Sequence, residues 1–224
     1  LLLKSIIQPG KKVFDIGAHI GEYLYVLEHI IPSNLVYAFE PVPHLYEKIL
    51  LLFPGMNIFN YAVSGNSGKM QFKIPYIQNK QVDTRGTLEI SGKEENESGR
   101  IIFPVDAITL DEFTMKNKIH DIGLIKIDVE GHEIAVLEGS RKIIEKERPV
   151  MIIEIEQRHH EGKRVNEIIT YVESYGYTGW YIDRDALQLK EVTEEVCEQQ
   201  KSDHTGSGQY INNFIFFPKT NYKI

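Results

Sequence analysis

The sequence predicts an α/β domain built on a doubly wound, mostly parallel sheet. Short β-rich runs alternate with helical patterns along most of the chain, and this alternation calls for a sheet with helices on both faces. The length of 224 residues and a hydrophobic content of 42% suffice for one large domain with a full core. We therefore expect a single domain over residues 1–224.

The alternation can be followed element by element. The expected strands of the alternating part are, in order, 12–16, 35–40, 57–63, 122–129 and 149–156. The expected helices are 21–31, 43–53, 132–147 and 163–175. The last two expected strands, 177–183 and 210–218, have no helix pattern between them, so we expect an antiparallel hairpin at one edge of the sheet.

The pattern changes at about 65–106, where short β-rich runs flank a long polar stretch. The centre of this segment has few large apolar residues, so we expect a flap-like, mobile insertion over the carboxyl edge of the sheet. A second polar stretch, 194–209, is expected to be a surface loop. The chain begins with Leu1 in what reads as the end of a helix, so we expect it to be excised from a larger polypeptide with further domains.

Composition excludes several classes of function. The formal net charge of −7 is spread without long blocks of either sign, which disfavours a nucleic-acid partner. Cys197 is the single cysteine, so no intramolecular disulfide forms, and we expect a reducing, cytoplasmic location. No stretch approaches the roughly 18 consecutive apolar residues of a membrane span.

A glycine turn follows the first expected strand. Asp15 lies near the end of that strand, and Gly17 and Gly21 flank the turn into the next helix, where free amides and the helix dipole favour a carboxylate or phosphate. The spacing is neither the dinucleotide fingerprint nor a P-loop. Glu40 ends the second strand, where doubly wound nucleotide folds place an acid that binds ribose hydroxyls.

The turn and Glu40 together indicate a ligand that carries a nucleoside and an anionic group but no pyrophosphate. S-adenosylmethionine fits this description. Its carboxylate would meet the helix terminus, its ammonium would meet Asp15, and its ribose would reach Glu40.

Several motifs, in this order, resemble those of FkbM-type S-adenosylmethionine-dependent methyltransferases. They are VFDIGAHIGEY, VYAFEPVPHLYEKI, NYAVSGNSGKMQF, ITLDEF, IGLIKIDVEGHEIAVLEGS and PVMIIEIE, and they cover roughly residues 10 to 156. The resemblance implies a class I methyltransferase (Rossmann-like) fold, with a seven-stranded sheet and a reversed last strand. It also implies O-methylation, often of a sugar or polyketide hydroxyl.

The resemblance also implies roles for individual residues. It places Asp15, Gly17 and Gly21 at the methionine end of the cofactor and Glu40 at the ribose, with Ala18 and Pro41 beside them. The residues implied along the adenine are Asn60, Ala62 and Ser64. The segment DTRGTL, with Arg85, stands where such proteins often have a substrate or cofactor loop.

A second group of chemical residues follows the later strands. Lys126 and Asp128 share one face of a strand by its period of two, and Glu130 lies just beyond the strand end. Lys126, Asp128 and Glu130 are candidate catalytic residues, and Asp128 is a candidate for cofactor binding as well. Glu154 lies among apolar neighbours and needs a partner, so we expect it either to pair with a cation such as Lys126 or to act as an acid or base.

Transfer of a methyl group to a hydroxyl requires a group that accepts the hydroxyl proton. His159 and His160 follow the strand that carries Glu154 and are the candidate general bases. His132, Tyr76 and Arg85 are candidates for substrate binding. A divalent metal is the less favoured alternative, and its oxygen ligands would come from Asp128, Glu130 and Glu154.

The sequence therefore predicts an S-adenosylmethionine-dependent O-methyltransferase acting on a carbohydrate hydroxyl, in a glycan or glycoconjugate. Several alternatives stay open, a protein acceptor among them. The same chemistry could serve a lipid, a polyketide or another small molecule; the fold could belong to an enzyme that binds a nucleotide sugar or NAD; or the domain could have lost its chemistry. The polar insertion, with Tyr76 and Arg85, favours the sugar.

Overall fold

The computed structural model describes residues 2–159, 165–198 and 210–219. The strands of its main sheet are β1 (Lys12–Ile16), β2 (Val36–Phe39), β3 (Asn57–Phe59), β8 (Ile122–Ile127), β9 (Val150–Glu154), β10 (Tyr177–Asp183), β11 (Gln188–Glu191) and β12 (Asn213–Pro218). The helices are α1 (Leu2–Ile6), α2 (Glu22–Glu28), α3 (Pro43–Leu52), α4 (Leu110–Asn117), α5 (Glu133–Glu138), α6 (Arg141–Glu147), α7 (Val165–Ser174) and α8 (Glu194–Glu198). No helix in these ranges is long and apolar enough to cross a membrane.

The main sheet is mixed, with the order β11-β10-β12-β9-β8-β1-β2-β3. Strands β9, β8, β1, β2 and β3 are parallel, while β12 runs antiparallel to both β9 and β10. Because the parallel strands all end at the same edge, the residues at and after their carboxyl ends are brought together there.

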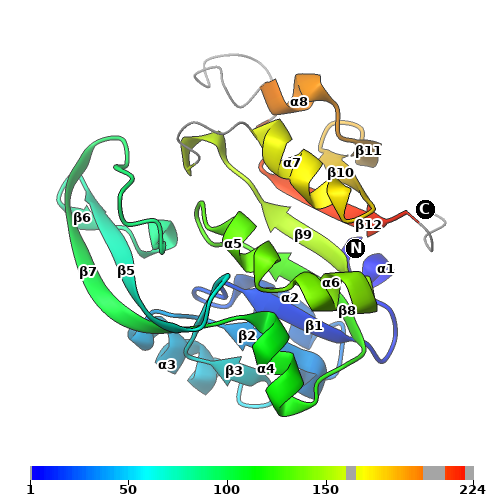
Figure 1. The fold of residues 1–224 in the computed structure, drawn as a ribbon, viewed down its shortest axis with the longest axis horizontal. Helices are drawn as coiled ribbons and strands as arrows, with labels where there is room; N and C mark the ends of the chain where they lie inside the picture. Colours follow the sequence, from blue (N-terminus) through cyan, green and yellow to red (C-terminus); the bar gives the residue numbers. More distant parts are fainter. Residues whose placement is uncertain (1, 160–164, 199–209, 220–224) are drawn as a thin grey trace.

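Alternate residues of the central strands form two separate cores. Val13 and Leu124 pack with α1, α2 and α3 on one face, whereas Phe14 and Ile125 pack with α4 to α7 on the other. This arrangement follows from the period of two along a strand, and it confirms the prediction of a sheet covered on both faces. The helices lie on both sides of the sheet in Figure 1.

In the part of the chain that the structure describes, the main sheet has eight strands, not the expected seven. The expected pairing of 177–183 with 210–218 is present as β10 with β12, but β11 adds a further strand at the edge. The chain reverses before β11 because Asp183 Oδ1 accepts backbone N–H bonds from Asp185 (3.0 Å) and Ala186 (2.9 Å).

Two other expected elements are divided. The expected strand 57–63 is split into β3 and β4 (Ala62–Val63), which belong to different sheets. The expected helix 132–147 is split into α5 and α6 at Gly139, because the chain there packs so closely against Ser64 that a Cβ would lie 2.1 Å from the Ser64 carbonyl oxygen. Helix α8 occupies the start of the expected loop 194–209, whose remainder lies outside the described residues.

The insertion forms a second sheet of order β4-β7-β5-β6. Strands β5 (Gly68–Ile77) and β7 (Glu97–Ile108) pair antiparallel as a long ribbon, which curves away from the main sheet in Figure 1. Between them lie β6 (Lys80–Gln81) and the short turn η2 (Asp83–Arg85), with the 3₁₀ turns η1 (Ser33–Leu35) and η3 (Gln157–His159) elsewhere in the chain. Backbone bonds of 2.8 and 2.9 Å between Lys73 and Thr87 join the polar segment to β5.

The aromatic contacts of α4 give a test of the packing. Phe113 lies edge-on to Phe39 and Phe59, with ring centroids 4.9 and 4.8 Å apart. Phe113→Ala should lower the free energy of unfolding by about 3–5 kcal/mol, because it leaves a cavity below the strand ends. Met115→Ala, in the same helix but with Met115 74% exposed, should change it by less than about 0.5 kcal/mol. Urea unfolding measures both, and equal effects would contradict this view of the core.

Candidate functional site

A pocket of about 850 Å³ lies at the carboxyl edge of the main sheet. The ends of β1 and β2 contribute Ile16 and Phe39, while β8 and β9 contribute Asp128 and Glu154 from their carboxyl ends. Thr84, from the insertion, closes one side of the pocket. Topology alone therefore brings segments that are far apart in the sequence to one cavity.

Both glycines of the first turn are required by close packing. Gly17 has φ +79°, and a Cβ there would lie 2.0 Å from the carbonyl oxygen of Asp128. Gly21 has φ +90°, and a Cβ there would lie 2.6 Å from the ring of Phe53. Only Gly17 lines the pocket, together with Ala18. Gly21 shapes the turn from behind by allowing α2 to approach α3.

The amides of this turn are already bonded within the protein. The N–H groups of Gly17 and Ala18 donate to the carbonyl oxygen of Phe39, at 3.0 and 3.1 Å. The N–H of His19 donates to Glu40 Oε2 at 2.7 Å. The expectation that the turn offers free amides to a ligand is therefore wrong for these three groups, because the turn uses them to bind the end of β2.

Glu40 is buried and lines the pocket. It accepts N–H bonds from His19 and, at 2.8 Å, from Val42, which is the residue before α3. Burial raises the pKa of Glu40 to about 7, against the lowering effect of the two backbone bonds. Glu40 therefore both organises the start of α3 and faces the cavity.

The residues expected along an adenine divide into two groups. Ala62 lines the pocket, as does Pro41, which is expected beside Glu40. Asn60 lies behind the wall and donates to the carbonyl oxygens of Glu40 (2.8 Å) and Pro41 (3.1 Å). The Ser64 hydroxyl hydrogen-bonds His132 Nε2 at 2.9 Å. In the described structure Ser64 does not line the pocket.

Lys126 occupies the centre of the pocket floor. Its Nζ lies 3.1 Å from Asp15 Oδ1 and 3.4 Å from Asp128 Oδ2, and it donates to the Gly17 carbonyl at 2.9 Å. It also lies 5.0 Å from the centroid of the Tyr23 ring. Burial alone would lower the pKa of Lys126, but the neighbouring carboxylates reverse this effect and raise it, so Lys126 is a cation.

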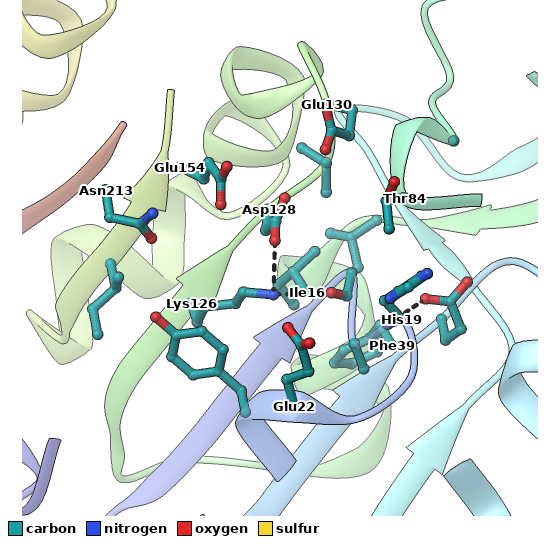
Figure 2. A pocket seen from close by; sticks show the side chains of 18 of the residues that line it. Ile16, His19, Glu22, Phe39, Thr84, Lys126, Asp128, Glu130, Glu154 and Asn213 are labelled. Carbon is teal, nitrogen blue, oxygen red and sulfur yellow. Dashed lines mark hydrogen bonds and ion pairs between the residues drawn. The ribbon is translucent and has the colours of Figure 1, made fainter. Parts of the chain in front are cut away.

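Asp15 lies beneath Lys126 and does not line the pocket. It is fully buried, and this burial raises its pKa although Lys126 opposes the shift. The direct contact expected between Asp15 and a ligand is therefore not available in this arrangement, because Lys126 stands between them. Asp128 is the carboxylate of this group that faces the cavity (Figure 2).

Glu154 lies at the end of β9 and points into the same cavity (Figure 2). Its Oε1 accepts a bond from the Asn212 amide at 2.6 Å, and no ion pair joins it to Lys126 in the described ranges. Burial, together with the charges of Asp128 and Glu130, raises the pKa of Glu154 to about 8. Of the two roles expected for Glu154, a pair with a cation such as Lys126 or an acid or base, the geometry favours the acid or base.

His159 does not line the pocket in the described structure and belongs instead to a cluster of charged side chains. Its Nε2 contacts Glu130, and its Nδ1 lies 3.3 Å from Glu94 of the insertion. Burial alone would lower its pKa, but the bonds to the two carboxylates raise it to about 9. This arrangement does not favour His159 as the general base, because both of its ring nitrogens face carboxylates and its raised pKa favours the protonated form. His160 lies outside the described residues.

Arg158 and Arg85 complete the group around Glu94. Arg85 Nη1 lies 3.2 Å, and Arg158 Nη1 3.9 Å, from Glu94 Oε2. Arg158 Nη2 also lies 3.6 Å from Glu130 Oε2. Glu94 therefore joins the insertion to the turn after β9, and Arg85 and Arg158 both line the pocket.

Of the other two residues expected to bind substrate, one lines the pocket and the other does not in the described structure. His132 lines the pocket, and its Nδ1 lies 2.6 Å from Glu89 of the insertion. Tyr76 lies on β5 opposite Gly99 and does not line the pocket in the described structure. Its expected role is not supported, because the ribbon turns away from the sheet before it reaches Tyr76.

A metal centre finds little support in this geometry. Among the residues that the structure describes, no group of three or more histidine, cysteine, aspartate or glutamate side chains is arranged to hold a metal ion. Asp128 is paired with Lys126, and Glu130 with His159, so that among the described residues Glu154 is the member of the expected ligand set without a cation beside it.

Sequence reasoning missed several contributors to the site, among them Glu22, Tyr23, Glu94, Arg158 and Asn212. Glu94 lies in a charged stretch of the insertion that has no period, so nothing marked it. Asn212 precedes β12 and bonds both Glu154 and Glu156. The need of buried carboxylates for partners was the one available signal, and it does not say which residue meets the need.

Comparisons with known proteins agree with one another. A sequence model described as the methyltransferase FkbM domain matches residues 15–178. The hexuronic acid methyltransferase AglP of Haloferax volcanii is 30% identical over 148 residues, which are 62% of this chain and 53% of that protein. The chain thus spans about half the length of this curated relative.

A solved structure shows the same fold. The FkbM methyltransferase of Methylobacillus flagellatus KT superposes with a TM-score of 0.53 and 16% identity, covering 92% of this chain and 43% of that one. At this identity the likeness concerns the fold alone. It agrees with the mixed α/β sheet described above.

Removal of the Glu94 carboxylate tests the cluster of charged side chains around His159. Glu94→Gln should lower the free energy of unfolding by about 1–3 kcal/mol at pH 7, because Arg85, Arg158 and His159 lose their shared anion. The matched control is Glu95→Gln, the exposed neighbour, which should change it by less than about 0.5 kcal/mol.

The effect of Glu94→Gln should also depend on pH. The folded pKa of His159 is raised to about 9, so its contribution is complete below about pH 6.5 and is lost as the pH rises through about 9. Urea unfolding at pH 6.5 and pH 10 measures this. A difference between Glu94→Gln and Glu95→Gln that is as large at pH 10 as at pH 6.5 would contradict the role of the protonated imidazole.

Proposed function

Since the chain belongs to the FkbM methyltransferase family, whose model matches residues 15–178, we propose that it is an S-adenosylmethionine-dependent O-methyltransferase acting on a carbohydrate hydroxyl. The observation that carries the proposal is the single pocket in which the Gly17 turn, Glu40 and the acid Glu154 meet. The relative named as a hexuronic acid methyltransferase supports a sugar as the acceptor.

The residues present fit the cofactor in size and charge. The cavity of about 850 Å³ accommodates a nucleoside and leaves room beside it. We assign the ribose to Glu40, whose two oxygens each keep a lone pair after bonding His19 and Val42. Ala62 and Pro41 would lie along the adenine, and Asn60 would support that wall.

The methionine end of the cofactor is assigned to the side of the pocket formed by Gly17 and Asp128. Asp128 is the lining carboxylate of the Lys126 group, so it suits the cofactor ammonium. Asp15 and Gly21, which the resemblance places at this end, would act indirectly. Asp15 holds Lys126 from below, and Gly21 keeps α2 against α3.

The bound cofactor supplies an electrophilic methyl group. Glu154 is the residue best placed to take the proton of the acceptor hydroxyl, because it points into the cavity and its pKa of about 8 lies near ambient pH. Asn212 holds the Glu154 carboxylate in position. Lys126 holds Asp128 in an ion pair. Asp128 is therefore assigned to the cofactor ammonium, and Glu154 to the proton transfer.

An acceptor with an apolar part is the second candidate. One wall of the same pocket is apolar and includes Leu2, Leu3, Val26, Ile30 and Ile182. This wall suits the aglycone of a glycoside, or a lipid or polyketide acceptor, by burial of apolar surface. The proposed chemistry is the same for each of these acceptors.

Binding of S-adenosylhomocysteine tests the proposed cofactor site. Glu40→Gln should weaken binding by about 10- to 100-fold, because an amide nitrogen replaces one of the two carboxyl oxygens that would bind the ribose hydroxyls. Glu47→Gln, on the exposed side of α3, should bind as the natural chain does. Calorimetry measures the affinities, and urea unfolding of the free proteins shows whether Glu40→Gln is folded. A natural chain that binds neither S-adenosylmethionine nor S-adenosylhomocysteine would refute the proposal.

The pH dependence of methyl transfer tests Glu154. A base works when it is deprotonated, so kcat/KM should rise with pH through about 8, which is the pKa of Glu154. Glu154→Gln should remove this limb and lower the rate by about 10²- to 10⁴-fold. Glu191→Gln, an exposed acid on β11, should keep both. Retention of the limb in Glu154→Gln would show that another group is the base.

A further inference from the structure

The side of the pocket at the ends of β8 and β9 is rich in carboxylates. Asp128, Glu130 and Glu154 come from the ends of β8 and β9, and Glu22 comes from the first turn of α2 on the opposite side. Figure 2 shows Glu22, Asp128 and Glu154 around the head of Lys126, with Glu130 above them. An acceptor that reaches Glu154 must therefore pass along this wall.

The cations that line the same pocket already have partners in the protein. Lys126 is held by Asp15 and Asp128, and Arg85 by Glu94. Arg158 contacts Glu156 and Glu130, and Arg184 also has an interaction partner. An anion that entered the pocket would have to displace one of these contacts before it could bind a cation, and the displaced carboxylate would stay in the pocket.

The site already disfavours the ionised form of its own carboxyl groups. Burial raises the pKa of Glu130 against the lowering effect of His159, and burial together with neighbouring acids raises the pKa of Glu154. A carboxylate on a ligand would meet the same desolvation and the same repulsion. Sugar hydroxyls, in contrast, can donate to these carboxylates, and Thr84 and Asn213 add neutral polar groups to the lining.

We propose that the acceptor sugar of this enzyme carries no carboxylate, and that the acidic wall of Glu22, Asp128, Glu130 and Glu154 selects against uronic acids. This inference rests on the proposed function. The relative from Haloferax volcanii is named for a hexuronic acid, so we expect the two proteins to differ in the charge of the sugar that they accept.

Matched pairs of glycosides test the inference. The 4-nitrophenyl β-glucoside and β-glucuronide differ only at C6, which is a hydroxymethyl group in the first and a carboxylate in the second, as do the galactoside and galacturonide. Release of S-adenosylhomocysteine measures turnover, and calorimetry in the presence of saturating S-adenosylhomocysteine measures acceptor binding without turnover. In each pair the neutral glycoside should be favoured at least about 10-fold in kcat/KM and in affinity.

Charge variants locate the discrimination. Glu22→Gln removes one negative charge from the wall and should reduce the preference for the neutral glycoside at least about 3-fold. Glu28→Gln makes the same change in the same helix, at an exposed residue that does not line the pocket, and should leave the preference unchanged. If Glu28→Gln reduced it equally, net charge rather than the wall would be responsible, and the inference would be overturned.

The outcomes separate this inference from the function on which it rests. A uronide that is bound and methylated as well as its neutral partner overturns the inference and leaves a carbohydrate methyltransferase in place. If no glycoside is bound or methylated although S-adenosylhomocysteine binds, the proposed acceptor class fails, and the inference fails with it.

Discussion

The ion pair of Lys126 with Asp15 is the interaction on which the site depends. It joins the adjacent strands β1 and β8 below the pocket, and the same ammonium group also binds Asp128 and the Gly17 carbonyl. A buried aspartate without this cation would be strongly destabilising, and a lysine without the aspartate equally so. The floor of the pocket, the course of the first turn and the direction of Asp128 are thus set together by one charged group.

The close approach of two backbones completes this arrangement. Gly17 can lie against the Asp128 carbonyl only because it has no side chain. The N–H groups of the turn donate to the Phe39 carbonyl and the Glu40 carboxylate. These bonds hold the end of β2 beside the end of β1. A glycine turn that looks like an anion site in the sequence is here a connector between strand ends, and the polar groups that face the cavity are side chains.

The sequence predicted the parts of this site that depend on strand order. Alternating elements place Glu40, Asp128 and Glu154 at the carboxyl ends of the parallel strands β2, β8 and β9, and they do line one pocket. It failed where the outcome depends on contacts between distant segments. Nothing in the local pattern shows that Glu94 of the insertion meets His159, or that Lys126 covers Asp15. The edge strand β11 was missed because it is short and polar, with one half-buried apolar residue, Leu189.

The distribution of charge explains why the acids of the site differ in chemistry. Burial raises the pKa of Asp15, Glu40, Glu130 and Glu154 alike, and the partners decide the rest. Glu94, surrounded by Arg85, Arg158 and His159, has a lowered pKa despite its burial. Glu154 has an amide rather than a cation beside it in the described structure, and three acids lie nearby. Little therefore opposes the rise of its pKa. A chain that draws its cations into ion pairs at the floor and rim thereby leaves Glu40 and Glu154 able to exchange a proton near neutral pH.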